Sequence, residues 1–322
     1  MKTIIILVLI ISIMTETIDF QQSVKLGSFK VTHINDGVVS VEPKSLYPES
    51  TNSFWEKNKD LLDKNGKISL PFGGFLIETE NKKILMDLGV GPERVNVKGI
   101  GYAQGGALLK NLEKAGVKPE EITDVFFTHL HQDNIGWATT KKNGKYELTF
   151  PKANYWVSEF EWNHFVTTIK EEKGDKEINQ DLLNRFYEPI KNVIQFAKEK
   201  QQIAPNLSVI SVAGHSPNLN LLRLAADRKI LWFTSDIFHT VAEFNDFMMF
   251  TDLDHSKFVK ESRILIVPEF TRPHAFLANA RFGKYVFGKL HDKNRVLVWE
   301  PCTTKECRLY LDGQTIAFEE DL

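Results

Sequence analysis

Three short segments of the chain carry residue types that bind metal ions. His129, His131 and Asp133 lie within five residues, His215 stands in a Gly-His-Ser-Pro segment, and Asp236 stands in a Thr-Ser-Asp segment. In extended backbone, residues i and i+2 point the same way, so the imidazoles of His129 and His131 can reach one ion. Three imidazoles and a carboxylate suit a borderline metal such as Zn²⁺. We therefore predict a zinc site.

Three protein nitrogens plus one open position are typical of a catalytic zinc ion rather than a structural one. Such an ion lowers the pKa of a bound water towards neutrality and yields hydroxide, which attacks a carbonyl or phosphoryl centre. A serine nucleophile does not compete with this interpretation, because Ser216 lacks the context of a nucleophile elbow. The predicted reaction is metal-assisted hydrolysis.

Each of these segments follows a strand-like run. Residues 124–128 precede His129, residues 207–211 precede His215, and residues 230–233 precede Asp236. In an α/β protein the ends of such strands converge on one crevice, where ligands bind. The strands must therefore bring the three segments together.

The remaining pattern alternates strands with helical segments. Hairpins are expected at 29–41, with an Asn-Asp-Gly turn, and at 73–87, and a further strand at 264–267. Apolar residues predict a helix over 107–115 ending at Gly116, and recur at helical spacing over 181–200, where Pro189 predicts a kink. Two runs of strands with helices between them suggest two sheets covered by helices.

The three segments resemble those of the metallo-β-lactamase superfamily in their order and residue patterns. That superfamily carries a His-x-His-x-Asp-His motif, a Gly-His-(Thr/Ser)-Pro motif, an Asp that bridges two metals, and a late His. The chain is most similar to the branch that holds N-acyl-homoserine lactonases and methyl parathion hydrolase. The resemblance runs from about Leu26 to Trp299 and implies a four-layer αββα sandwich. It also implies one or two zinc ions per chain, with these metal ligands: His129, His131, Asp133, His215, Asp236 and His274.

In this resemblance Asp236 bridges to a second metal that Asp133 and His274 hold. Asp87, in a Met-Asp-Leu-Gly segment, matches the family's early Asp-x-Gly. We expect its carboxylate to accept an N–H from a ligand histidine and to fix that ring's tautomer.

Asn134 stands where the family motif has a further histidine. A neutral amide is a poor ligand for zinc. Three outcomes stay open. In the first, the second metal site binds weakly or stays empty, and Asp133 is the catalytic general base beside a single zinc. In the second, Asn134 coordinates the second metal through its side-chain oxygen. In the third, the chain is a catalytically silent binding protein that keeps the fold.

The amino-acid composition limits the classes of molecule that the protein is expected to bind. The formal net charge is −2 without a basic cluster, which argues against nucleic acid. Aromatic residues between Trp156 and Phe196 either wall a pocket or form ordinary core. We expect a small, largely apolar, ester-like substrate, and a homodimer is compatible with the sequence.

The N-terminus predicts export. Lys2 precedes an apolar run over 4–14 that is short for a bilayer span, so residues 1–17 are either a signal peptide or an uncleaved anchor, and 18–322 form the metallo-β-lactamase-like domain. The expected location is secreted or membrane-anchored outside the cytoplasm. Cys302 and Cys307 are then either a hairpin-closing disulfide or a pair of free thiols.

Overall fold

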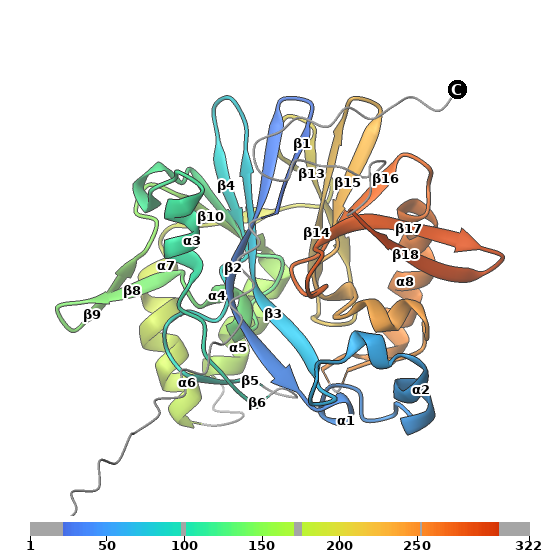
Figure 1. The fold of residues 1–322 in the computed structure, drawn as a ribbon. Helices are drawn as coiled ribbons and strands as arrows, with labels where there is room; N and C mark the ends of the chain where they lie inside the picture. The colour runs from blue at the N-terminus through green and yellow to red at the C-terminus, as the bar shows by residue number, and fades with distance from the viewer. Residues whose placement is uncertain (1–21, 98–100, 171–175, 252, 303–322) are drawn as a thin grey trace, which may run out of the picture.

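Two seven-stranded sheets pack face to face, and helices cover their outer faces (Figure 1). This computed structural model describes residues 22–97, 101–170, 176–251 and 253–302. The strand order is β1-β2-β3-β4-β7-β10-β11 in the first sheet and β12-β13-β14-β15-β16-β17-β18 in the second. The predicted four-layer αββα sandwich is confirmed.

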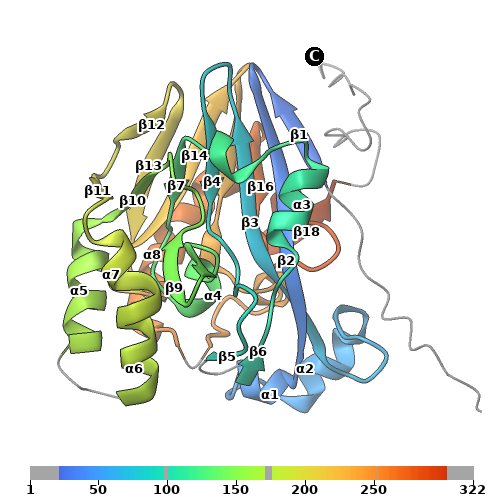
Figure 2. The ribbon, with the colours of Figure 1, turned by 90° about the vertical axis from the view of Figure 1, so that its left-hand side faces the viewer.

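The first sheet is built from residues 23–197 and the second from residues 202–301, so each sheet uses one continuous part of the chain (Figures 1 and 2). The strands of the first sheet are β1 (Ser23–Leu26), β2 (Phe29–Val41), β3 (Ile68–Glu78), β4 (Lys83–Met86), β7 (Asp124–Phe126), β10 (Asn154–Ser158) and β11 (Ile194–Ala197). Those of the second are β12 (Gln202–Ala204), β13 (Leu207–Val212), β14 (Leu219–Ala226), β15 (Lys229–Phe233), β16 (Ala275–Ala278), β17 (Phe287–Lys293) and β18 (Val296–Pro301).

Helices and two small hairpins complete the layers. The helices include α1 (Pro43–Leu46), α2 (Asn52–Lys57), α3 (Leu108–Lys114), α4 (Gln132–Ile135), α5 (Glu159–Lys170), α6 (Lys176–Leu182), α7 (Glu188–Ile190) and α8 (Ser256–Phe270). The hairpins pair β5 (Val95–Val97) with β6 (Gly101–Ala103) and β8 (Thr139–Lys142) with β9 (Lys145–Leu148). None of the described helices is long and apolar enough to cross a membrane.

The alternating orientation of side chains along each strand explains how both faces of the sheets are packed. On β3, Phe75 and Ile77 pack between the two sheets, whereas Leu76 belongs to the cluster beneath the helices of the first sheet. On β14, Leu222 packs between the sheets and Leu221 packs in the cluster beneath α8. Side chains of a strand point alternately to its two faces, and both faces here are buried, so these strands are largely apolar.

The two predicted hairpins have different outcomes. The one over 73–87 is confirmed, since β3 pairs with β4 in a register that joins Glu78 to Lys83. The one over 29–41 is wrong, because β2 runs straight through with only a bulge near Asp36. The Asp36 carboxylate accepts hydrogen bonds from the Gly91 and Leu108 backbone N–H groups and from Trp137 Nε1, so this residue anchors a bulge rather than a turn.

The helix over 107–115 is confirmed as α3, with Gly116 at a φ of 79°. The helical spacing over 181–200 holds only as far as Ile190. It forms α6, a π-helical turn over 183–187 and the short α7 that contains Pro189, and residues 194–197 then become β11. The predicted strand at 264–267 is also wrong, because these residues lie inside α8. A short apolar run does not by itself separate a strand from a helix.

Two predictions fall outside the described residues. The leader over 1–17 lies there, and so does Cys307, so the export signal and the Cys302–Cys307 pair stay predictions.

Candidate metal centre

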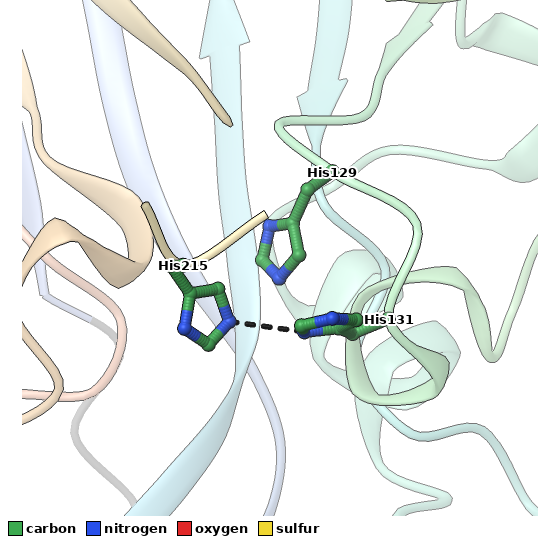
Figure 3. A group of neighbouring side chains, drawn as sticks. All are labelled: His129, His131 and His215. Atoms are coloured by element: carbon green, nitrogen blue, oxygen red, sulfur yellow. Dashed lines mark hydrogen bonds between the residues drawn. The ribbon is translucent and has the colours of Figure 1, made fainter. Parts of the chain in front are cut away.

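Three of the predicted ligands meet where the loop after β7 faces the loop between β13 and β14. The Nδ1 atom of His131 lies 2.9 Å from Nε2 of His215, and one nitrogen from each of His129, His131 and His215 lies within 4.8 Å of the others (Figure 3). The three rings meet edge to face, with centroids 4.6 to 4.8 Å apart. The sequence placed these residues at strand ends, and the fold brings them together.

The protonation state of His129 and His131 suits a metal ion. Burial, reinforced by the neighbouring imidazoles, lowers the pKa of His129 well below its usual range and that of His131 to about 4. These two rings are therefore neutral at physiological pH and offer lone pairs. Three imidazole nitrogens at this spacing fit zinc, and the ligand role of each residue stays a prediction.

Glu161 of α5 ties the two histidine loops to each other. Its Oε1 accepts a hydrogen bond from the Leu130 backbone N–H, and its Oε2 accepts one from the Asn218 backbone N–H, each over 3.3 Å. Leu130 sits between the first two histidines, and Asn218 follows His215. One buried carboxylate thus sets the distance between the loops.

Gly214 allows His215 to approach the site. Its φ is 133°, and a Cβ built on it would lie 2.4 Å from the backbone nitrogen of Val259 in α8. Only glycine fits between this loop and the helix, which explains the Gly-His pair.

Thr128 lies directly behind His129. Its Oγ1 is 3.0 Å from His129 Nδ1, donates to Asp87 Oδ2 over 2.8 Å and accepts from Ser235 Oγ over 2.8 Å. The prediction that Asp87 contacts a ligand histidine directly is therefore wrong, because the threonine hydroxyl stands between them. Burial raises the pKa of Asp87 to about 8. Asp87 and Ser235 both have positive φ, 56° and 44°.

His215 is held from behind by a second group. Its Nδ1 lies 3.0 Å from Asp254 Oδ1 and 3.0 Å from His239 Nε2. His239, three residues after Asp236, is thus a buried neighbour of a candidate ligand. Asp254 was missed, since it lies in an irregular segment without a motif.

The two acidic candidates share one cation, Arg281. Arg281 Nη2 donates to Asp133 Oδ2 over 2.5 Å and to Asp236 Oδ2 over 3.0 Å, while its Nε donates to Asp236 Oδ1 over 2.9 Å. Asp236 Oδ2 also lies 3.7 Å from His129 Nε2 and 3.5 Å from His215 Nε2. Both carboxylates are thus at the site, and the residue that pairs them was missed by the sequence analysis.

His274 is not at the site, which corrects its assignment as a late ligand. His274 is exposed and lies just before β16. Its backbone carbonyl accepts a hydrogen bond from the Ile230 backbone N–H, near the start of the neighbouring strand β15. The cluster lies at the other end of these strands, after Phe233 and Ala278. Arg281 follows that end.

Asn134, in α4, faces both the cluster and Arg281. Its Nδ2 is 3.1 Å from His129 Nε2, and its Oδ1 is 3.5 Å from Arg281 Nη2.

A pocket of about 970 Å³ opens over the histidines. His131, Asp133 and His215 line its polar end, and its apolar wall consists of Leu130, Phe160, Phe165, Ile169, Ile178, Leu182, Leu253 and Phe258, among others. Of the predicted aromatic block, Phe160 and Phe165 line this pocket, whereas Trp162 and Phe186 are buried in the core beneath the helices. Both interpretations of the block therefore hold, for different residues.

Comparison with known proteins supports the fold. Residues 74–143 match the family model described as the metallo-beta-lactamase superfamily. A curated N-acyl homoserine lactonase from Bacillus cereus is 24% identical over 203 residues, which are 58% of this chain and 72% of the relative.

Solved structures show the same fold. AidC, described as a dizinc quorum-quenching lactonase in complex with a product, superposes with a TM-score of 0.75 at 23% identity over 88% of this chain and 97% of its own. The hydrolase AbOPH superposes with a TM-score of 0.73 at 21% identity over the same shares. An N-acyl homoserine lactone hydrolase with N-hexanoyl-L-homoserine at its catalytic metal centre has a TM-score of 0.54 at 21% identity, over 80% of this chain and 93% of its own. The chain therefore has the metallo-β-lactamase fold. These comparisons confirm its resemblance to that superfamily and, within it, to N-acyl-homoserine lactonases.

Proposed function

We propose that this protein is a metal-dependent hydrolase that uses zinc held by His129, His131 and His215 to cleave a lactone, ester or phosphoester. The observation that carries the proposal is the cluster of three imidazoles, two of which, those of His131 and His215, line the polar end of a largely apolar pocket. When bound, the ion supplies a Lewis acid and an activated water at that position.

The protein's own groups would orient the reactants. Asp133 lines the pocket beside His131, and Arg281 fixes one of its two oxygens. This carboxylate is the proposed general base, since it is held at the polar end where a proton must be accepted. His131 and His215 stand on the same wall, so the reacting carbon or phosphorus would lie against these side chains.

The apolar wall supports a substrate with a hydrocarbon portion. Helices α5 and α6 contribute Phe165, Ile169 and Leu182 to it, and α8 contributes Phe258. A pocket of this size and composition suits an acyl chain attached to one polar, reactive group. Among the three ester classes we propose an acyl lactone first, because the curated relative and two of the solved structures described above are lactonases.

The test is turnover of a panel that contains an N-acyl-homoserine lactone, an aryl ester and an organophosphate triester. Each is assayed with zinc-loaded protein and again after chelation. Turnover of one class that chelation abolishes and zinc restores is the expected result. His131→Ala should remove the activity, and His274→Ala, which changes an exposed histidine away from the site, is the matched control.

The alternative is a catalytically silent binding protein. Failure of zinc-loaded, folded protein on the entire panel would favour it. Tight binding of a substrate analogue in the pocket without turnover would establish it.

A further inference from the structure

The place where a second metal would lie is already filled by a side chain. Arg281 Nη2 lies 2.5 Å from an oxygen of Asp133, 3.0 Å from an oxygen of Asp236 and 3.5 Å from the amide oxygen of Asn134. The family resemblance assigns Asp133 and Asp236 to a second ion, and Asn134 stands where the family motif has a further histidine. One nitrogen of one guanidinium therefore contacts an oxygen of each of these three residues.

The charge of Arg281 does what a second ion would otherwise do. Asp133 and Asp236 are both buried, and two unpaired carboxylates so close together would repel each other. Arg281 donates to Asp133 Oδ2 and to both oxygens of Asp236, so one buried positive charge lies between the two carboxylates.

A backbone hydrogen bond and packing against an aromatic ring hold Arg281 at this position. Its backbone N–H donates to Asn279 Oδ1 over 2.8 Å, and its guanidinium lies 5.2 Å from the centre of the Phe72 ring. Asn279 Nδ2 in turn donates to the backbone carbonyl of Ser235 over 2.7 Å, next to Asp236. Arg281 and Asp236 are thus linked through the backbone as well as through their ion pair.

Little space remains beside the guanidinium. The cavity between Arg281, Asp236, Asn134 and Asp87 holds about 20 Å³, which is close to the room that one water needs. A divalent ion with its shell of ligands would have to displace Arg281.

We propose that this protein holds a single metal ion, at His129, His131 and His215, and that Arg281 permanently replaces the second ion of a two-metal centre. Asn134 belongs to this arrangement, because its amide oxygen can accept from the guanidinium, whereas a histidine at 134 would face a fixed cation. Arg281 is a positioning residue: it orients Asp133 and Asp236 beside the metal and lies outside the lining of the large pocket. This inference rests on the proposed metal-dependent function and specifies the composition of its centre.

The first test is the metal content of the full-length wild-type chain. Protein is loaded with excess zinc, freed of unbound metal and analysed by mass spectrometry, and metal-free protein is titrated with Co²⁺ while its visible absorption is followed. One zinc per chain and a titration that saturates at one equivalent are expected. Two equivalents would overturn the inference and leave the hydrolase proposal intact. Less than about half a zinc per chain would overturn both, because three histidines should hold the first ion firmly.

The second test rebuilds the missing site. The double variant Asn134→His with Arg281→His removes the cation and restores nitrogen donors, and it should raise the Co²⁺ stoichiometry from one to two. Arg281→Lys keeps a cation and should stay at one, as should His274→Ala. Asn134→His alone should also stay at one. A folded double variant, checked by circular dichroism, that still binds one ion would show that Arg281 is not what excludes the second, and an Asn134→His protein with two ions would show the same.

Discussion

The Nδ1 atom of His215 lies 3.0 Å from Oδ1 of Asp254, on the side of the ring away from the other two histidines. An N–H on Nδ1 that donates to this carboxylate leaves Nε2 with a free lone pair, and Nε2 is the atom that faces His131. Asp254 thereby selects the tautomer that can bind a metal. Its other oxygen accepts from the Thr251 backbone N–H over 2.8 Å, so the carboxylate itself is held in place.

Asp254→Asn should therefore weaken zinc affinity about 10- to 100-fold, the range typical for loss of a carboxylate behind a ligand histidine. The amide cannot accept from the His215 N–H and the Thr251 N–H with equal strength. Competition with a chromophoric chelator measures the affinity. Asp227→Asn, the same change in an exposed turn, is the control, and equal affinities for the two variants would contradict this role of Asp254.

Glu161 provides a second prediction, because it joins the two histidine loops. Glu161→Ala should leave the Leu130 and Asn218 N–H groups without their partner, lower the zinc affinity and broaden the range of loop positions. Loss of two hydrogen bonds to a charged, buried acceptor should also destabilise the fold by about 2–4 kcal/mol.

Chemical denaturation and chelator competition together check this prediction. Glu161→Gln keeps one acceptor oxygen and should fall between the wild type and Glu161→Ala in both measurements. A Glu161→Ala protein with unchanged zinc affinity would show that the loops hold their spacing without this residue.

The histidine triad was predictable from sequence because its information is local. His129 and His131 come directly after an apolar run, His215 is the histidine of a Gly-His pair, and the ends of strands converge in this fold class. The partners of the triad were not predictable in the same way. Thr128 is adjacent to His129, yet nothing in the sequence indicates that its hydroxyl stands between that ring and Asp87.

Arg281 was missed for a more specific reason. The apolar run over 264–267 is predicted as a strand, and the family resemblance assigns the late histidine to His274. In the structure that run is part of α8, and its exposed face includes Ile264 and Leu265. The true strand, β16, begins only after His274, so its far end delivers Arg281 to the site. His274 therefore lies at the opposite end of β16 from the histidine cluster, and Arg281 follows the end of β16 that is near the site.

His33 allows a prediction about stability that does not involve the metal. Burial lowers its pKa to about 4, and its ring packs on Phe75 at 5.5 Å in the first sheet. The unfolded chain binds a proton near pH 6.5, so between about pH 6.5 and 4 it binds more protons than the folded chain does. The stability that neutral His33 provides is thus present above about pH 6.5 and is lost as the pH falls towards 4, by up to about 3 kcal/mol.

His33→Phe should remove this part of the pH dependence. Urea unfolding of the metal-free protein at several values between pH 4 and 7 measures it, and the variant should lose less stability on acidification than the wild type does. His291→Phe changes a half-exposed histidine on β17 and serves as the control. Parallel stability curves for wild type and His33→Phe would contradict the prediction.

The last prediction concerns the length of the substrate. Thr168 is an exposed residue of α5 that lines the large pocket, whereas its neighbour Thr167 is exposed and does not line it. Thr168→Trp should fill space along the apolar wall and shorten the room for an acyl chain. Each buried methylene contributes about 0.8 kcal/mol, so exclusion of two of them should lower kcat/KM about tenfold for a ten-carbon acyl lactone. A four-carbon lactone, which needs only the polar end, should be turned over nearly as before. Thr167→Trp adds the same bulk one residue away and should change neither rate. Equal loss on both substrates in Thr168→Trp would place the acyl chain elsewhere, and no loss on either would show that the substrate does not use the wall formed by α5.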